Sequence, residues 1–263
     1  MDLELDGKVA LVTGASSGLG LAIALALANE GMQVAMVARH QDALERAAAK
    51  VGIASHRHTL AIPGDVSDAA DVARMVREAT EALGPIDVLV ANAGGPPSTT
   101  FATTSEEQYL AAIEQNLMGS IRLAHACVPS MRARRWGRVL FVSSMAAKQP
   151  VAGLLLSNTA RAGLLGFAKT LANECAADNV LVNTVLPGHF DTARALELAR
   201  ARSLRDGRPV DEVLAERTAS IPVGRAGDPR EFAAVVAFLA SERASFITGV
   251  ALQVDGGQIG SVL

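Results

Sequence analysis

The feature that most constrains this chain is a glycine-spaced loop near its start, set between an apolar run and a helix-forming stretch. The run is Val9–Val12, the loop is Thr13–Gly20, and the stretch is Leu21–Asn29, with Gly31 placed to end it. Such a run is typical of a buried parallel strand. Glycines let a ligand approach the backbone closely, and the first N–H groups of a helix have no partner within it. This arrangement favours dinucleotide binding over a purely structural turn.

Strand patterns and helix patterns alternate through the rest of the chain. The further strands that we expect are Met32–Ala38, His58–Ile62, Ile86–Ala91, Val139–Ser143, Val180–Leu186 and Val250–Val254. The further helices are expected at 42–51, 67–83, 105–134, 154–177 and 229–240. The alternation predicts an α/β fold with right-handed crossovers. We expect a single Rossmann-type, doubly wound domain over residues 1–263, with helices on both faces of a parallel sheet.

Two of these helices begin with a capping signal. Ser67 can cap the helix that follows the third strand. Thr104 together with Glu107 fits a capping box before the long helix 105–134.

One connection is much longer than the others. Residues 187–221 form a polar, partly helical stretch that follows the carboxyl end of the sixth strand. Ligands bind at that end of the strands in doubly wound sheets, and long connections are often functional. The stretch is therefore predicted to be a substrate lid. A solvated helical excursion without a catalytic role is the alternative.

Composition argues against several classes of function. The net charge is −3 without a basic run, so we expect no nucleic-acid partner. No apolar stretch reaches the roughly 20 residues of a membrane span. The acidic start, MDLELD, lacks the pattern of a secretory signal, so the expected compartment is the cytoplasm. Cys127 and Cys175 are too few for a disulfide framework, and no metal site is expected.

Separated motifs together resemble the short-chain dehydrogenase/reductase family over nearly the whole chain. They are Thr13-Gly14-x-x-x-Gly18-x-Gly20, Asp65-Val66, Asn92-Ala93-Gly94, Asn116, Ser143-Ser144, and Pro187-Gly188 with Thr192. The resemblance implies a seven-stranded sheet and a nicotinamide dinucleotide cofactor. It also implies a homotetramer or homodimer packed through two long helices.

The same resemblance assigns residues to parts of the cofactor. The glycine loop would hold the diphosphate through Gly14, Ser16, Ser17, Gly18, Leu19 and Gly20. Asp65 and Val66 would flank the adenine, and Asn92, Ala93 and Gly94 would lie beneath the adenosine ribose. Pro187, Gly188 and Thr192 would meet the nicotinamide carboxamide.

The residue at the end of the second strand bears on the choice between NADP(H) and NAD(H). Relatives that prefer NAD carry an acidic residue there, which accepts hydrogen bonds from the ribose. This chain has Ala38 followed by Arg39. A guanidinium suits a 2′-phosphate, so NADP(H) is favoured over NAD(H). Two observations limit the inference: Arg39 could be an ordinary exposed charge, and Ser17 stands where relatives sometimes carry a second basic residue.

The catalytic pair of the family is where this chain departs from the pattern. Relatives use a tyrosine as proton donor, a lysine four residues later, a serine thirteen residues before the tyrosine, and an asparagine that supports a relay water. Ser144 and Asn116 match the last two, but Ser157 replaces the tyrosine and Arg161 the lysine. A serine hydroxyl is a far weaker acid than a phenol. Arg161 cannot act as a base, although it can hold the ribose or a developing oxyanion.

Other groups could carry the proton. His189 follows the Pro187-Gly188 pair, and Lys148 lies four residues after Ser144. Imidazole titrates near neutral pH, although either residue could also be an ordinary surface group. Tyr109, the only tyrosine, is expected in the core.

Three hypotheses follow. The first is an NADP(H)-dependent oxidoreductase, similar to 3-oxoacyl reductases, that acts on a small carbonyl or alcohol with an atypical catalytic centre. The second is a catalytically silent NADP(H)-binding sensor or oligomeric scaffold protein. The third is a non-redox enzyme, such as a lyase, on the same scaffold.

Overall fold

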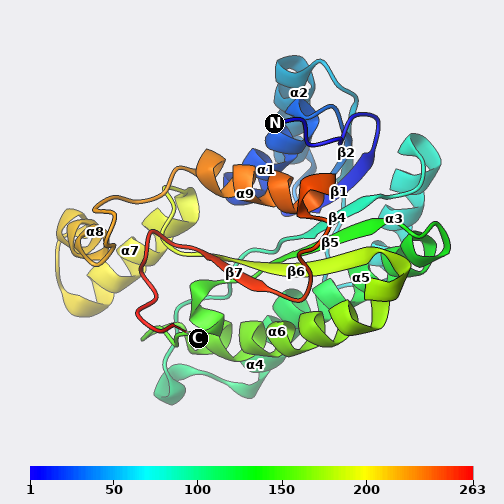
Figure 1. Cartoon of the computed structure of the whole chain (residues 1–263). Coiled ribbons are helices and arrows are strands. Elements are labelled where there is room, and N and C mark those ends of the chain that lie inside the picture. Colours follow the sequence, from blue (N-terminus) through cyan, green and yellow to red (C-terminus); the bar gives the residue numbers. More distant parts are fainter. Residues whose placement is uncertain (263) are drawn as a thin grey trace.

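The computed structural model describes residues 1–262 and contains one seven-stranded parallel sheet (Figure 1). The strand order is β3-β2-β1-β4-β5-β6-β7, so the chain builds outward from β1 in both directions. The strands are β1 (Val9–Thr13), β2 (Gln33–Ala38), β3 (Thr59–Pro63), β4 (Val88–Ala91), β5 (Gly137–Val142), β6 (Val180–Pro187) and β7 (Ala251–Val254). This confirms the predicted doubly wound fold, because every neighbouring pair of strands is parallel.

Two layers of helices cover the sheet (Figure 1). One face carries α1 (Gly18–Asn29), α2 (Gln41–Ser55) and α9 (Pro229–Ala240). The other face carries α3 (Ala69–Leu83), α5 (Gly119–Ala133) and α6 (Leu155–Cys175), with α4 (Glu106–Ile113) beyond them. Helices α7 (Ala193–Asp206) and α8 (Val210–Ala219) lie to one side of the sheet.

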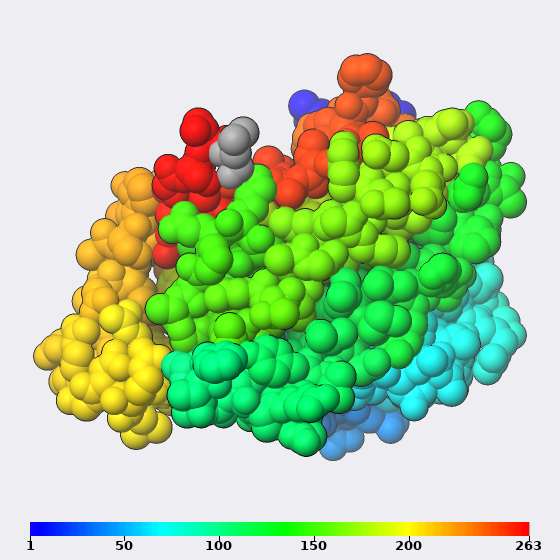
Figure 2. All heavy atoms as spheres, turned by 90° about the horizontal axis from the view of Figure 1, so that it is seen from below, coloured from blue at the N-terminus to red at the C-terminus, as the bar shows by residue number. Residues whose placement is uncertain are grey.

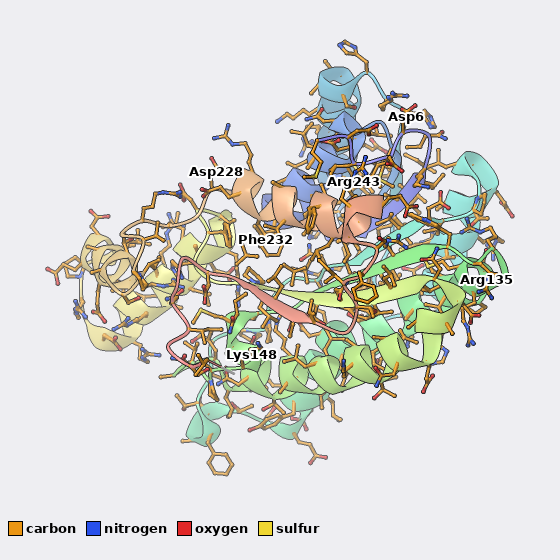
Figure 3. All side chains as sticks on the ribbon, viewed as in Figure 1. Asp6, Arg135, Lys148, Asp228, Phe232 and Arg243 are labelled. Carbon is orange, nitrogen blue, oxygen red and sulfur yellow. The ribbon has the colours of Figure 1, made fainter. Side chains whose placement is uncertain are left out.

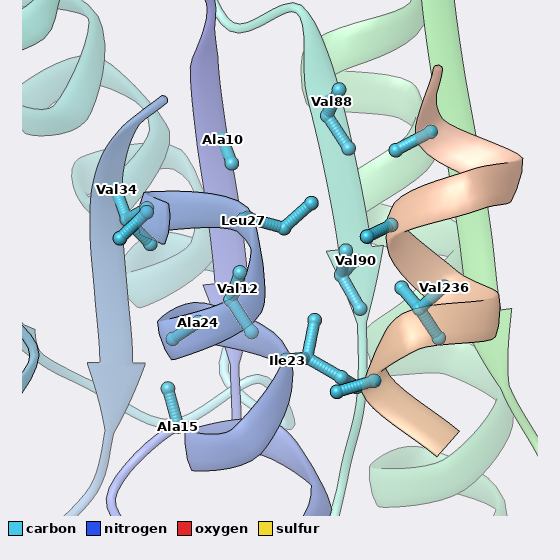
Figure 4. Close-up of a cluster of buried hydrophobic side chains, with 14 of the residues drawn as sticks. Ala10, Val12, Ala15, Ile23, Ala24, Leu27, Val34, Val88, Val90 and Val236 are labelled. Atoms are coloured by element: carbon cyan, nitrogen blue, oxygen red, sulfur yellow. The ribbon is translucent and has the colours of Figure 1, made fainter. Parts of the chain in front are cut away.

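The core between the sheet and the first layer is built from close-packed aliphatic side chains (Figure 4). Val12 on β1, Ile23 and Leu27 on α1, and Val236 on α9 are all fully buried there. Each such side chain contributes roughly 1.5–3 kcal/mol by leaving water. This packing fixes α1 against β1, and therefore fixes the loop between them.

The opposite layer buries both cysteines. Cys127 on α5 and Cys175 on α6 are free thiols within the second core cluster. Burial raises the pKa of the Cys127 thiol to about 12. Both residues therefore serve as small packing groups.

Two helix starts differ from the predictions by one residue. Asp68, and not Ser67, caps α3, because the Ser67 hydroxyl donates to Asp65 at 2.8 Å. Ser105 with Gln108 forms the capping box of α4. The predicted Thr104–Glu107 box does not form, because the Thr104 hydroxyl donates to the Thr100 carbonyl at 2.6 Å.

The long helix predicted over 105–134 is confirmed in extent, since the backbone is helical without a gap from Glu106 to Ala133. Within it, Glu114–Met118 forms a π-helical turn between α4 and α5, which the sequence did not predict. Asn116 lies within this turn and is buried. The prediction of Tyr109 as a core residue is wrong, because its position on α4 is only half-buried and it belongs to neither core cluster.

The connection after β6 leaves the sheet and returns to the same point. Phe190 and Gly227 form an isolated parallel bridge, in which the Asp191 N–H donates to the Gly227 carbonyl at 2.9 Å. The Gly227 N–H donates in turn to the His189 carbonyl at 2.8 Å. Phe190 also packs edge to face against Phe232, on the side of α9 that faces the sheet (Figure 3). Helices α7 and α8 therefore belong to a segment, residues 191–226, that begins and ends at one place beside the sheet. This segment is called the excursion below.

Within residues 1–262, none of the helices combines the length and the apolarity that crossing a membrane requires.

Candidate active site

A cleft of about 270 Å³ opens at the carboxyl ends of β1, β4, β5 and β6. Helix α7 borders it on the side away from the sheet, and Arg217 from α8 reaches into its wall. Figure 2 shows the α7–α8 region, in yellow to orange, at one end of the molecule against the green segments. Three arginines and one histidine line the cleft, and no acidic side chain of the described residues does so. The site is therefore suited to anionic or polarised ligands.

The glycine loop forms one wall of this cleft. A side chain at Gly14 would place its Cβ 2.7 Å from the Asn92 amide nitrogen, and one at Gly20 would lie 2.2 Å from the Gly14 carbonyl. Gly14 and Gly18 also have positive φ, at 61° and 56°. Ser17 precedes α1 without capping it through its side chain. The first N–H groups of α1 are thus left for a ligand.

The loop after β4 is fixed to the glycine loop. The Thr13 hydroxyl donates to the Asn92 carbonyl at 2.7 Å and accepts from the Asn92 N–H at 2.9 Å. The Asn92 side-chain amide donates to the Thr13 carbonyl at 3.2 Å. These contacts hold the ends of β1 and β4 together at the floor of the cleft.

The structure brings most of the predicted site residues to the cleft. Those that line it are Gly14, Ser17, Gly18, Leu19, Gly20, Asn92, Ala93, Gly94, Ser144, Ser157, Arg161, Pro187, Gly188 and Thr192, together with His189. Those outside its lining are Ser16, Arg39, Asp65, Val66, Asn116 and Lys148. Lys148 lies near the start of α6 (Figure 3).

The residues expected around the adenosine lie toward the other edge of the sheet. Arg39 is exposed directly after β2. Asp65 follows β3, and its carboxylate accepts from the Ser67 N–H at 2.9 Å. Val66 packs against Gly119, where a Cβ would lie 2.9 Å from the Val66 carbonyl.

Arg161 is buried beneath the cleft and is held by backbone carbonyls. Its guanidinium donates to the carbonyls of Val142 (3.1 Å), Ser143 (2.5 Å) and Ala93 (3.3 Å), at the ends of β5 and β4. Burial, with a smaller contribution from Arg194, lowers its pKa to about 10. Arg161 is therefore still a cation at neutral pH, positioned by the sheet itself.

Two other candidate catalytic groups, Ser144 and Ser157, line the same cleft as Arg161, whereas Asn116 lies outside its lining. The Ser144 hydroxyl accepts from the Ala146 N–H at 3.1 Å, a bond that does not use its own hydrogen. Ser157 is buried, with 7% of its surface exposed. In the π-helical turn, Asn116 donates to the Ala112 carbonyl at 3.3 Å, while its side-chain oxygen is buried without a partner. That oxygen can accept a hydrogen bond from water.

His189 is fixed in one tautomer by a residue far along the chain. Arg217 Nη2 lies 3.1 Å from His189 Nδ1. Because a guanidinium only donates, Nδ1 accepts and the proton is on Nε2, a buried atom without a partner in the structure. Burial, and then the charge of Arg217, lower the pKa of His189 to about 4. At neutral pH this imidazole is a neutral N–H donor.

Sequence reasoning missed several residues of the cleft. Arg194 and Arg217 are the most consequential, since Arg194 donates to the Pro96 carbonyl and joins α7 to the loop after β4. The sequence feature that could have identified them is the high density of arginines between residues 194 and 217, which distinguishes the long connection from the other loops. The remaining missed residues are Gly95, Val142, Leu154, Phe190, Ala193, Ala195 and Leu198, while Ser143 of the predicted Ser143-Ser144 motif also lines the cleft.

Comparisons with known sequences give a consistent result. A family model described as enoyl-(acyl carrier protein) reductase matches residues 14–258. Acetoacetyl-CoA reductase of Shinella zoogloeoides is 39% identical over 253 residues, covering 95% of this chain and 98% of that protein. The 3-oxoacyl-(acyl-carrier-protein) reductase FabG of Vibrio cholerae is 36% identical over 255 residues, covering 97% and 98%.

Solved structures with the same fold include enzymes in complex with NADPH. L-sorbose reductase from Gluconobacter frateurii, solved with NADPH and L-sorbose, superposes with a TM-score of 0.94 at 35% identity over the full length of both chains. Actinorhodin polyketide ketoreductase, solved with NADPH, gives 0.92 at 33% identity, covering 95% of this chain and 97% of that one.

Proposed function

The chain belongs to the short-chain dehydrogenase/reductase family, and on that premise we propose that it is an NADP(H)-dependent oxidoreductase. Its substrate is a small carbonyl or alcohol, as in 3-oxoacyl reductases. The observation that carries this proposal is the cleft itself. It places a nucleotide-accommodating glycine loop, an uncapped helix start and a buried cation together at the carboxyl ends of the strands.

The residues of the cleft fit a dinucleotide. A Cβ at Gly14 would clash with Asn92 and one at Gly20 with the Gly14 carbonyl, so only glycine allows this tight turn, and such a turn brings backbone N–H groups close to a diphosphate. Ser16, Ser17 and Leu19 complete this loop, and Asn92 to Gly94 would lie beneath the ribose. Pro187, Gly188 and Thr192 would hold the carboxamide, with Asp65 and Val66 beside the adenine. When bound, the cofactor supplies or accepts the hydride.

Arg39 supports a preference for NADP(H) over NAD(H). It is exposed at the end of β2, and Ala38 before it offers no carboxylate to a ribose diol. An exposed guanidinium at this point can pair with two oxygens of a 2′-phosphate. The NADPH in the structures of two similar enzymes agrees with this preference.

In the catalytic centre that we propose, hydrogen-bond donors in fixed positions take the place of the tyrosine that relatives use as proton donor. Ser144 binds the carbonyl oxygen, and the Arg161 cation stabilises the negative charge that develops there or anchors the nicotinamide ribose. Neutral His189 offers a further N–H, and water at Asn116 delivers the proton. Ser157 is a hydroxyl that neighbours this centre and is too weak an acid to replace a phenol alone.

The connection 187–221 acts as the substrate lid of a single domain. Residues of α7 and α8 line the cleft, and Arg194 fixes α7 to the loop after β4. Besides the small substrate, the expected partners are further copies of the chain, which pack through α5 and α6 into a homodimer or a homotetramer.

A second candidate function is a catalytically silent NADP(H)-binding protein. The observation that favours it is the use of Arg161: its guanidinium is committed to the carbonyls of Val142, Ser143 and Ala93, and Ser157 offers no phenol. In this alternative the cleft binds the nucleotide and a partner reads its redox state.

The test is a calorimetric titration of the purified protein with NADPH and NADH, followed by a carbonyl panel with nicotinamide absorbance as readout. Tight NADPH binding with turnover supports the oxidoreductase. NADPH binding without turnover on any carbonyl supports the silent protein. Tight binding of NADH alone contradicts the assignment of Arg39, and binding of neither nucleotide contradicts both functions.

A further inference from the structure

A second cavity of about 280 Å³ adjoins the cleft on the substrate side. Its wall is partly apolar, from Val151, Leu154 and Leu198, and partly cationic. The cations are Arg202 and Arg205 on α7 and Arg217 on α8. No carboxylate of the described residues lines this cavity.

The two cavities share a boundary. Leu154, Leu198 and Arg217 line both of them. Arg217 therefore stands at the junction, where it also contacts His189 Nδ1 at 3.1 Å and donates to the Ala195 carbonyl at 3.2 Å. A ligand that enters the cleft from this side passes along two leucines and meets a guanidinium.

The cofactor does not account for these arginines. The second cavity shares no residue with the glycine loop, with Asn92 to Gly94, or with Pro187 and Gly188. The anionic diphosphate expected at the glycine loop therefore lies at the far side of the cleft from this group. The charge in the second cavity is available to another ligand.

Most of the nearby cations already have carboxylate partners. Arg202 pairs with Asp206 at 3.1 Å and with Glu216 at 2.5 Å, and Arg205 pairs with Asp206 at 2.8 Å. Arg217 differs from both, because no carboxylate within residues 1–262 lies within 4.0 Å of it. Burial and the charges of Arg202 and Arg194 lower the pKa of Arg217 to about 10, so it still carries its proton at neutral pH.

A partly buried guanidinium without a counter-ion is costly unless a ligand supplies the opposite charge. We propose that the substrate is an oxo acid whose carboxylate binds Arg217, while its aliphatic stem packs against Val151, Leu154 and Leu198. A carboxylate matches the planar guanidinium and carries the single charge that one unpaired arginine balances. This proposal rests on the proposed function for the reacting carbonyl, and it adds the chemical class of the substrate.

The first test measures binding alone, in the protein saturated with its nucleotide. Calorimetry compares pentanoate with pentanamide, which has nearly the same shape and no charge, and with butylphosphonate. We expect pentanoate to bind about tenfold more tightly than pentanamide, or better. Equal affinities would overturn the proposal, and a clear preference for butylphosphonate would replace the carboxylate by a phosphate-like group.

Three variants locate the effect. Arg217→Gln should remove the preference for pentanoate, and Arg217→Lys should restore part of it because the charge returns without the planar fork. Arg208→Gln is the matched control, since Arg208 lies on the same excursion, pairs with Glu216 at 2.5 Å and lines neither cavity. Nucleotide affinity in each variant reports whether the fold is intact. A preference that survives Arg217→Gln in a protein that still binds nucleotide would contradict the site.

The second test separates this proposal from the proposed function. NADPH oxidation is followed with levulinate and with levulinamide, and we expect kcat/KM to be higher for levulinate by about tenfold or more. Reduction of both at equal rates would keep the reductase and overturn the carboxylate site. Arg217-dependent binding of pentanoate without reduction of either ketone would keep the carboxylate site and contradict hydride transfer.

Discussion

At the scale of single residues, Arg161 is the buried cation of the proposed catalytic centre. Its hydrogen bonds go to the carbonyls of Val142, Ser143 and Ala93. A lysine ammonium is a mobile point charge, whereas a guanidinium bound in this way is fixed. On the proposed assignment of Arg161 to the position of the family's lysine, the positive charge is therefore kept and its mobility is lost.

Restoring the family pair tests whether only the acid is missing. The double variant Ser157→Tyr with Arg161→Lys should raise the rate of NADPH-dependent carbonyl reduction by about a hundredfold, because a positioned phenol can donate the proton. Stopped-flow absorbance of NADPH measures this rate. Ser157→Phe with Arg161→Lys is the control for ring size without the hydroxyl. Equal rates for the double variant and the wild type would mean that the pocket itself differs from that of relatives.

Local motifs were predictable at this scale, and long-range contacts were not. Gly14 was predicted from the glycine-spaced loop and Asn92 from the resemblance to the family, and the structure places both in the cleft. The helix cap at Asp68 was missed because the hydroxyl of Ser67 binds Asp65, a choice among neighbours that composition does not determine. Arg217 was missed because its contact with His189 spans 28 residues.

At the scale of elements, the excursion formed by α7 and α8 is attached to the sheet by few side chains. His189 at the end of β6 accepts from Arg217 on α8, and Arg194 on α7 binds the Pro96 carbonyl. With α8 in place, the pKa of His189 is lowered to about 4 by burial and by Arg217. When the excursion moves away, the imidazole regains its ordinary pKa of about 6.5.

This difference in the pKa of His189 predicts that acidic pH favours the state in which α7 and α8 have moved away from the sheet. Between about pH 6.5 and 4 the open state binds more protons than the closed state, so opening becomes more favourable as the pH falls. Hydrogen exchange in α7 and α8, corrected for intrinsic rates, should be at least about threefold faster at pH 5 than at pH 7.

Arg217, which contacts His189, stays protonated in this window, because its pKa is lowered only to about 10. The pKa values of Asp206 and Glu216 on the same excursion are lowered by their arginine partners, which moves both carboxylates further from this window. His189→Gln keeps a hydrogen-bonding side chain and should abolish the dependence. The same acceleration in that variant would assign the effect to another group.

The strands were more predictable than the helices. Each β strand is a short apolar run bounded by turn residues, and all seven were found within two residues of their bounds. The π-helical turn at Glu114–Met118, which contacts α4, α5 and α6, has no comparable signal in the sequence. The patterns of 105–134 therefore predicted one continuous helix.

At the scale of the whole molecule, the exposed side of α6 is suited to self-association. Ala162, Gly163 and Gly166 are exposed on this helix, and small residues allow another copy to approach closely. A Cβ at Gly166 would meet nothing within 4 Å in the single chain. A large side chain there would thus be tolerated by the monomer and excluded from a packed interface.

We predict that the wild type has two or four times the 27.2 kDa mass of the chain in light scattering after gel filtration. Gly166→Arg should shift it to a smaller species without loss of secondary structure. Ala73→Arg, on the exposed side of α3, is the control and should leave the mass unchanged. A wild-type mass of one chain would contradict the predicted assembly, and an unaffected Gly166→Arg variant would move the interface away from α6.

The bridge between Phe190 and Gly227 has a consequence for how such a protein can acquire new substrates. The excursion departs from and rejoins the sheet at one anchor, so its length and composition can change while the distance that it spans stays constant. The part of this stretch that forms α7 and α8 can therefore be exchanged as a unit. Replacing it with the corresponding part of a relative, with Thr192 retained, should transfer substrate selectivity while leaving the glycine loop unchanged.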